Sequence, residues 1–161
     1  MKNAAYFIDK LQMLPHPEGG FYKETYRSAA LIPNFSGDQR SISTAIYFLL
    51  EKDNRSHFHR IKSDELWFHH YGETLEILSI QNGKLVSTFL GSDLENGEVL
   101  QTTIPANTWF ASKMKNYSGF GLVSCTVAPG FDFADFEMAK KNELIKEFPD
   151  LEMIINEMSL A

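Results

Sequence analysis

The chain has 161 residues, a formal charge of −6 and 22% charged residues, which predicts one soluble globular domain over residues 1–161. Its 15 Lys and Arg residues are scattered, whereas nucleic-acid binding needs them clustered, so no nucleic-acid partner is expected. No apolar run approaches the roughly eighteen residues of a membrane span, which predicts no membrane partner and a cytoplasmic location. Cys125 is the only cysteine, so no intramolecular disulfide can form, and its apolar neighbours predict a buried packing thiol.

The predicted elements begin with a helix over residues 4–14, which Pro15 and Pro17 would stop. Asn82-Gly83 predicts a tight type I′ hairpin turn, because both residues accept positive φ angles. Short strands are predicted by alternating or β-branched patterns over 20–27, 43–50, 57–61, 65–71, 74–80, 85–90, 98–104, 109–113 and 119–127. Strands of this length and spacing predict a β-sandwich or barrel.

The period of the apolar residues becomes helical after Pro129-Gly130. Asp132 is a candidate N-cap, apolar and long side chains recur every four residues from Phe136 to Phe148, and Pro149 would end the helix. A last helix is expected after Asp150. The sequence therefore predicts an all-β domain with short helices at its N-terminal and C-terminal ends.

Histidines cluster in one part of the chain: four of the five lie between His57 and His70. Alternate side chains of a strand share a face, so His57 and His59 are expected to point the same way. Glu65 can return on the next strand to meet them. Imidazole and carboxylate groups at this spacing can hold a metal ion or transfer a proton.

The pattern H-x-H, then Glu65 and, seven residues further on, Gly72 resembles the first motif of the cupin superfamily, which implies a double-stranded β-helix, or jelly roll. Cupins usually have three or four residues between the second His and the Glu. Here there are five, so Asp64 or Glu65 is the candidate carboxylate. The second cupin motif resembles the segment from Pro105 to Phe110. Phe110 stands where that motif has a His, which removes the fourth ligand of a metal-binding cupin.

The whole chain is similar to an uncharacterised cupin family recognised by four segments. They correspond here to residues 15–22 (PHPEGGFY), 56–60 (SHFHR), 64–67 (DELW) and 127–131 (VAPGF). The strand from Gly20 to Tyr26 also resembles the N-terminal strand of the RmlC-like deoxysugar-nucleotide 3,5-epimerases. Gly19 replaces the basic residue that these epimerases have before the glycine.

These residues predict a pocket in which His59 acts as the base. Glu65 or Asp64 would orient the imidazole, although Glu65 could also be a metal ligand or a base itself. Glu65, Trp67 and His69 share one face of their predicted strand, whereas His70 lies on the other face with packing residues. The candidate ligand-binding residues are Tyr22, Glu24, His57, Trp67, His69 and Trp109.

We therefore expect a cupin that binds a small molecule and isomerises or epimerises a sugar or carbonyl compound by proton transfer. One alternative is a metal-dependent, oxygenase-type cupin that holds a divalent metal with His57, His59 and Glu65. Another is a metabolite-binding protein without catalysis. Family likeness and the apolar stripes of the terminal helices predict a homodimer.

Overall fold

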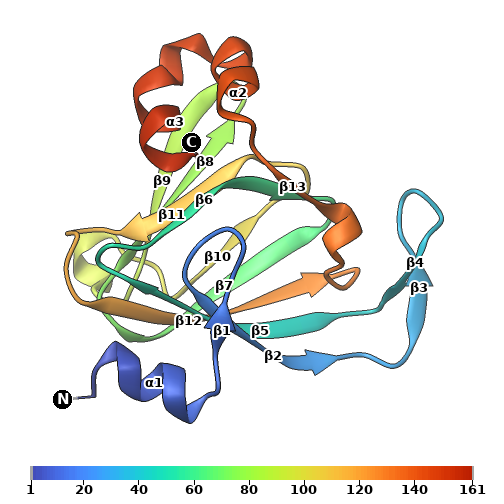
Figure 1. Cartoon of the computed structure of the whole chain (residues 1–161), viewed down its shortest axis with the longest axis horizontal. Helices are drawn as coiled ribbons and strands as arrows, with labels where there is room; N and C mark the ends of the chain where they lie inside the picture. The colour runs from blue at the N-terminus through green and yellow to red at the C-terminus, as the bar shows by residue number, and fades with distance from the viewer. Residues whose placement is uncertain (1, 161) are drawn as a thin grey trace.

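Two antiparallel sheets make up most of the structure, a computed structural model that describes residues 2–160 (Figure 1). The first sheet has the order β1 (Leu14–Pro15), β2 (Phe21–Arg27), β5 (Thr44–Glu51), β12 (Phe120–Ala128), β7 (Asp64–Gly72), β10 (Gln101–Ile104). The second has the order β13 (Phe136–Met138), β6 (Arg55–Ile61), β11 (Phe110–Met114), β8 (Leu75–Gln81), β9 (Lys84–Leu90). This arrangement confirms the predicted jelly roll, because strands far apart in the chain alternate across both sheets.

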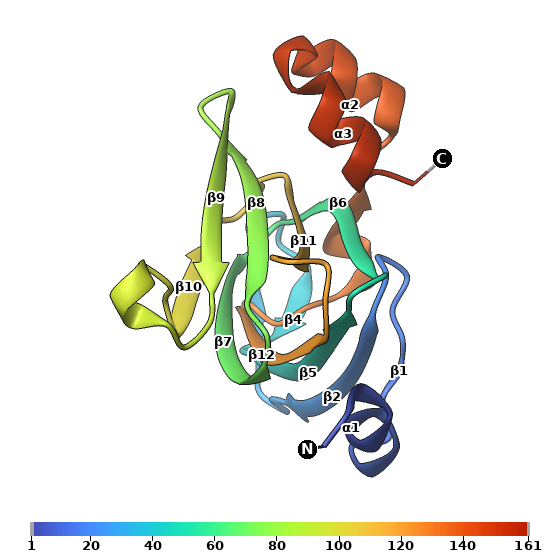
Figure 2. The ribbon, with the colours of Figure 1, turned by 90° about the vertical axis from the view of Figure 1, so that its left-hand side faces the viewer.

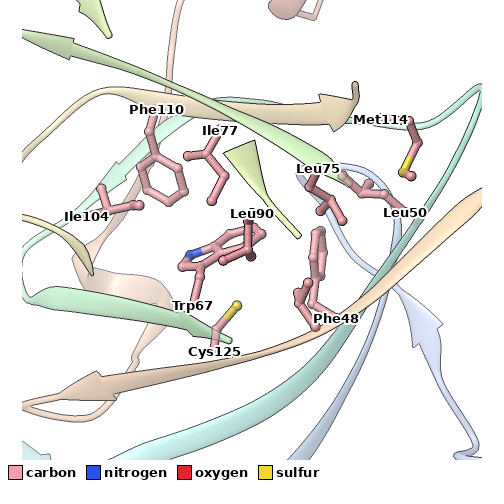
Figure 3. Packing of buried hydrophobic residues seen from close by; sticks show 11 residues of the cluster. Phe48, Leu50, Trp67, Leu75, Ile77, Leu90, Ile104, Phe110, Met114 and Cys125 are labelled. Atoms are coloured by element: carbon pink, nitrogen blue, oxygen red, sulfur yellow. The ribbon is translucent and has the colours of Figure 1, made fainter. Parts of the chain in front are cut away.

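The space between the sheets is filled at one end by a packed apolar core (Figure 3). Phe48 and Trp67 from the six-stranded sheet meet Phe110 and Ile77 from the five-stranded sheet, and all four are almost completely buried. Alternate side chains of a strand face the opposite sheet, so these period-2 patterns bury one face of each strand. Cys125 is buried in this core, as its sequence context predicted.

Short helices cover the outer faces of the sheets (Figure 2). Helix α1 (Ala4–Lys10) packs on the six-stranded sheet around Leu49 and Leu122. Helices α2 (Lys141–Glu147) and α3 (Glu152–Met158) pack on the five-stranded sheet around Phe58. No helix between residues 2 and 160 is both long and apolar enough to cross a membrane.

The local turn chemistry was predicted well. Asn82 and Gly83 join β8 to β9 with φ angles of 51° and 74°, which confirms the expected hairpin. The polar segment before β10 forms a short 3-10 helix, Leu94–Asn96.

Two predicted helices were wrong in extent. Helix α1 ends at Lys10, because the chain turns at Gln12, whose φ is 53°, and residues 14–15 pair with β2. Asp132 caps only the 3-10 turn Phe133–Asp135, after which β13 pairs with β6 where the sequence predicted a helix. Pairing with the free edge of β6 therefore overrides the four-residue period there.

An additional hairpin, β3 (Leu31–Pro33) and β4 (Gln39–Ser41), was not predicted and extends from the body as an arm (Figure 1). The guanidinium of Arg40 on the arm donates hydrogen bonds to both carboxylate oxygens of Asp135, at 2.7 and 3.1 Å. This ion pair joins the arm to the segment that leads into β13.

Candidate functional site

A cavity of about 450 Å³ occupies the other end of the space between the sheets. Its walls come from the inner faces of β2, β5, β7 and β12 on one side and from β6 and β13 on the other. The loop between β1 and β2 also contributes His16 and Glu18. The interior of the jelly roll is therefore divided into a packed half and a hollow half that contains titratable side chains.

The central pair of the cavity is Glu18 and His59, both almost completely buried. The Nε2 atom of His59 lies 3.0 Å from Oε2 of Glu18. Its Nδ1 atom lies 2.7 Å from the carbonyl oxygen of His57 and donates a hydrogen bond to it, because a carbonyl oxygen can only accept. A carboxylate oxygen also accepts, so a proton must lie between Nε2 and Glu18.

The electrostatics of this pair favour an imidazolium and a carboxylate. Burial alone would lower the pKa of His59, but the charge of Glu18 and its hydrogen bond raise that pKa overall. Burial alone would raise the pKa of Glu18, but His59 lowers it overall. The Oγ atom of Ser56 also donates to Oε1 of Glu18 at 2.9 Å. Both ring nitrogens of His59 therefore carry a proton and are engaged in hydrogen bonds. In this state His59 can donate a proton but cannot accept one, whereas the sequence predicted that it acts as a base.

Glu65 on β7 has the opposite ionisation behaviour in the same cavity. Burial raises its pKa from 4.5 to about 7, and repulsion by Glu18 adds to the shift. A carboxyl group with this pKa exchanges its proton near neutral pH. The cavity thus contains one carboxylate that stays ionised and one that is poised to accept or donate a proton.

A β-bulge explains why His57 does not join His59 in the cavity. His59 pairs with Phe110 and Ser56 pairs with Ser112, so β6 advances three residues where β11 advances only two. The alternation of faces is thereby interrupted, and the cavity is lined by His59 but not by His57. The Nδ1 atom of His57 instead lies 2.7 Å from the carbonyl oxygen of Glu18, which also accepts the His57 backbone N–H at 2.8 Å. His57 therefore anchors the loop that carries Glu18.

The remaining sequence candidates divide into two groups. Tyr22, Glu24 and Trp67 line the cavity. Three others do not: Asp64, His69 and Trp109.

The candidates outside the cavity have structural surroundings. Asp64 is exposed, and its Oδ1 accepts the backbone N–H of Ala106 at 2.8 Å. The backbone N–H of His69 donates to Leu100, beyond the cavity. Trp109 packs under the C-terminal helices with Arg60 over its ring, at 4.2 Å from the ring centroid. On the other face of β7, the ring of His70 meets the hydroxyl of Ser124 at 2.8 Å.

The expected metal ligands do not fit a metal site. His57 is directed to the carbonyl of Glu18, and His59 is already paired through both ring nitrogens. The ring of Phe110, with no lone pair to offer, packs 4.2 Å from that of His59, centroid to centroid. Within residues 2–160, no group of three or more His, Cys, Asp or Glu side chains is arranged to hold a metal ion.

The cavity entrance combines aromatic rings with paired charges. Phe131, Phe133 and Phe136 pack edge to face, with ring centroids 5.0 to 6.2 Å apart. Arg27 donates to both carboxylate oxygens of Glu24, at 3.0 and 2.7 Å, and to the carbonyl oxygen of Phe131 at 3.1 Å. The segment after Pro129 thus forms a wall of the site, although its sequence predicted a helix.

The main residue that sequence reasoning missed is Glu18. It lies in the turn between Pro17 and Gly19-Gly20, which the sequence analysis treated as part of a recognition segment. Gly19 has a φ of 111°, and a Cβ atom there would lie 1.9 Å from the carbonyl oxygen of Arg55. The glycine therefore lets the turn approach β6 closely enough for Glu18 to reach His59. In the sequence Glu18 looks like an exposed turn residue, and only its contact with His59 in the folded chain identifies it as part of the site.

A jelly roll with a polar cavity between its sheets defines the chain as a cupin. The family model described as "Cupin superfamily (DUF985)" matches residues 5–139, and the chain belongs to that family. An uncharacterised protein of Saccharomyces cerevisiae, YML079W, is 31% identical over 153 residues, which cover 86% of this chain and 76% of the yeast protein.

Solved structures extend the similarity to the whole fold. A hypothetical protein from Leishmania major has a TM-score of 0.93 at 36% identity, with 99% of this chain and 100% of the other covered. Protein SO0799 from Shewanella oneidensis has a TM-score of 0.91 at 39% identity, with 99% of each chain covered. Oxalate decarboxylase from Bacillus subtilis has a TM-score of 0.56 at 10% identity, covering 89% of this chain and 36% of the enzyme. That last similarity concerns the fold alone.

Proposed function

We propose that the protein is an enzyme that isomerises or epimerises a small carbonyl or sugar-like compound by proton transfer. The observation that carries this proposal is the presence of two carboxyl groups with opposite ionisation beside His59 in a single cavity. Glu18 is held ionised against His59, whereas the pKa of Glu65 is raised to about 7 by burial. A base and an acid matched to neutral pH are the requirement for removing a proton beside a carbonyl.

The residues suggest the following steps. Ionised Glu65 removes a proton from the carbon next to the carbonyl. The electron pair of that C–H bond forms a C=C bond, and the carbonyl oxygen takes the proton that His59 holds against Glu18. Reversal of both transfers, at the neighbouring carbon or on the opposite face, releases the isomer and restores the ionisation of Glu65 and His59.

The cavity also supports binding of an oxygen-bearing ligand. Trp67 lines the cavity with 1% of its surface exposed, and its indole N–H makes no hydrogen bond of ordinary geometry among residues 2–160, although it faces the carboxyl group of Glu65. A buried donor of this kind is stabilised when a ligand supplies an acceptor. A carbonyl or hydroxyl oxygen would be such an acceptor.

Proton exchange with solvent tests the proposal without knowledge of the product. The protein is incubated in D₂O with a panel of aldoses, ketoses and hydroxy- or amino-carbonyl compounds, and ¹H NMR follows the signal of the proton next to each carbonyl. We expect loss of that signal for at least one compound, and no loss with the Glu65→Gln variant. Exchange at the wild-type rate in Glu65→Gln would contradict the assigned base. A lack of exchange across the panel would favour the alternative of binding without catalysis.

A further inference from the structure

The side chains that line the cavity carry an excess of acidic groups. Among the described residues, four carboxyl side chains meet one guanidinium, two imidazoles and no lysine. The cavity is otherwise mainly aromatic and aliphatic. Its acidic side chains are Glu18, Glu24, Glu65 and Asp132.

The single guanidinium is not free to bind an anion. Arg27 directs one hydrogen bond to each oxygen of Glu24 and a third to the carbonyl oxygen of Phe131. His59 is paired with Glu18 in the same way. The other imidazole, His16, is held neutral, because burial lowers its pKa and its Nδ1 accepts the backbone N–H of Glu18 at 3.2 Å. Both cations are thus neutralised by cavity residues, and a carboxylate or phosphate of a ligand would find no unpaired positive partner there.

Two of the carboxyl groups form no salt bridge within the described residues, although the charge of His59 acts on Glu65 and that of Arg27 acts on Asp132. Glu65 lies in the floor of the cavity, and Asp132 lies at its entrance, where Oδ1 accepts the backbone N–H of Ala134 at 2.8 Å. Aromatic rings, including those of Phe131 and Phe136, line the same cavity. Ring faces attract cations, so carboxylates and rings together favour a positively charged ligand.

We propose that the cavity selects a small ligand that carries an amine, together with an oxygen that accepts the free indole N–H of Trp67, and rejects anionic compounds such as sugar phosphates and carboxylic acids. This inference rests on the proposed function in that it names the substrate class of the same cavity, an amino-carbonyl or amino-sugar compound. The selectivity itself depends only on the charges of the site and on the indole N–H of Trp67. Binding at equilibrium tests it independently of turnover.

Three probes of the same shape separate charge from size: benzylamine, benzyl alcohol and benzoate. Isothermal titration calorimetry gives their affinities for the full-length wild type, and the indole ¹H–¹⁵N resonance of Trp67 shows whether each occupies the cavity. We expect benzylamine to bind roughly tenfold more tightly than benzyl alcohol and benzoate to bind most weakly. Equal affinity for the amine and the alcohol, tighter binding of benzoate, or no saturable benzylamine binding would each overturn the inference.

Two variants at the half-exposed entrance sharpen the test, because neither removes a core side chain. Asp132→Asn should weaken benzylamine binding severalfold and leave benzyl alcohol binding unchanged. Glu24→Gln should release Arg27 and raise the affinity for benzoate. Wild-type affinities for all three probes in both folded variants would contradict the electrostatic explanation. Proton exchange that persists while benzylamine fails to bind would refute this inference and leave the proposed function standing.

Discussion

At the scale of single residues, the site depends on two carboxyl groups that experience different surroundings. Glu18 has a histidine and a serine hydroxyl within hydrogen-bond distance. Glu65 has no cation that close and is buried beside the charge of Glu18. The same side chain chemistry therefore gives an ionised group in one position and a titrating group in the other.

The first prediction concerns the pKa of His59. Glu18→Gln keeps the shape of the side chain but removes the charge that stabilises the imidazolium. We expect the pKa of His59 to fall below its usual 6.5, because burial would then act without the opposing charge of Glu18. Titration of the ring by ¹H–¹⁵N NMR measures this change, with His70 as an internal reference. An unchanged His59 pKa would mean that Glu18 is not its counterion.

The second prediction concerns stability against pH through Glu65. The folded pKa, about 7, lies above the ordinary 4.5, so the folded state holds a proton that the unfolded state has lost. The folding stability contributed by this group is therefore full below about pH 4.5 and falls by on the order of 3 kcal/mol as pH rises through about 7.

Glu65→Gln removes this titration. We expect the variant to gain stability relative to wild type between about pH 4.5 and pH 8, as measured by urea unfolding across that range. A constant difference between the two proteins at every pH would show that Glu65 ionises normally.

At the scale of elements, a turn and a bulge bring the catalytic candidates together. The turn before β2 carries Glu18, and the bulge in β6 directs both Ser56 and His59 toward it. Neither feature follows from the alternation of apolar and polar residues. Each requires the exact approach of two backbone segments.

The third prediction tests that approach with two glycines. Gly19→Ala places a Cβ atom against the carbonyl oxygen of Arg55, whereas Gly37 also has positive φ, 86°, but faces open space. Gly37→Ala should cost only the backbone conformational energy, about 1 kcal/mol, and Gly19→Ala at least about 2 kcal/mol more. Urea unfolding compares the two. Equal losses would show that the turn can move away from β6 at no cost.

At the scale of the whole molecule, the C-terminal helices are held to the barrel by a mostly buried lysine. The Nζ atom of Lys113 lies 2.6 Å from the hydroxyl of Tyr117 and 3.0 Å from Oε1 of Glu157 on α3. Nonpolar contacts of Ile155 and Met158 with the five-stranded sheet complete the attachment. This covering buries Phe58 on the outer face of β6.

The fourth prediction measures the contribution of that lysine. Lys113→Met should destabilise the fold by about 2 kcal/mol, because Tyr117 and Glu157 lose a charged donor. Lys140→Met, at the exposed pair with Glu143, is the matched control and should change the stability by less than about 0.5 kcal/mol. Thermal unfolding of both variants decides the matter, and similar effects would contradict a special role for Lys113.

The fifth prediction is the homodimer. The β3–β4 arm exposes apolar side chains, with Phe35 91% exposed and Leu31 61% exposed. We expect a dimer by size-exclusion chromatography with light scattering, and a shift toward monomer in Phe35→Asp. A wild-type monomer at micromolar concentration would refute the expectation.

The sequence by itself determined the fold class, most strands, the hairpin at Asn82 and two of the central residues, His59 and Glu65. Those features depend on local signals, namely period-2 burial, turn chemistry and recognisable motifs. Tertiary structure alone decided that Glu18 is the partner of His59 and that His57 stays outside the cavity. It also placed β13 where a helix was expected. The reason is physical: contacts between segments distant in sequence, a bulge and a glycine-dependent close approach set these positions, and no local pattern encodes them.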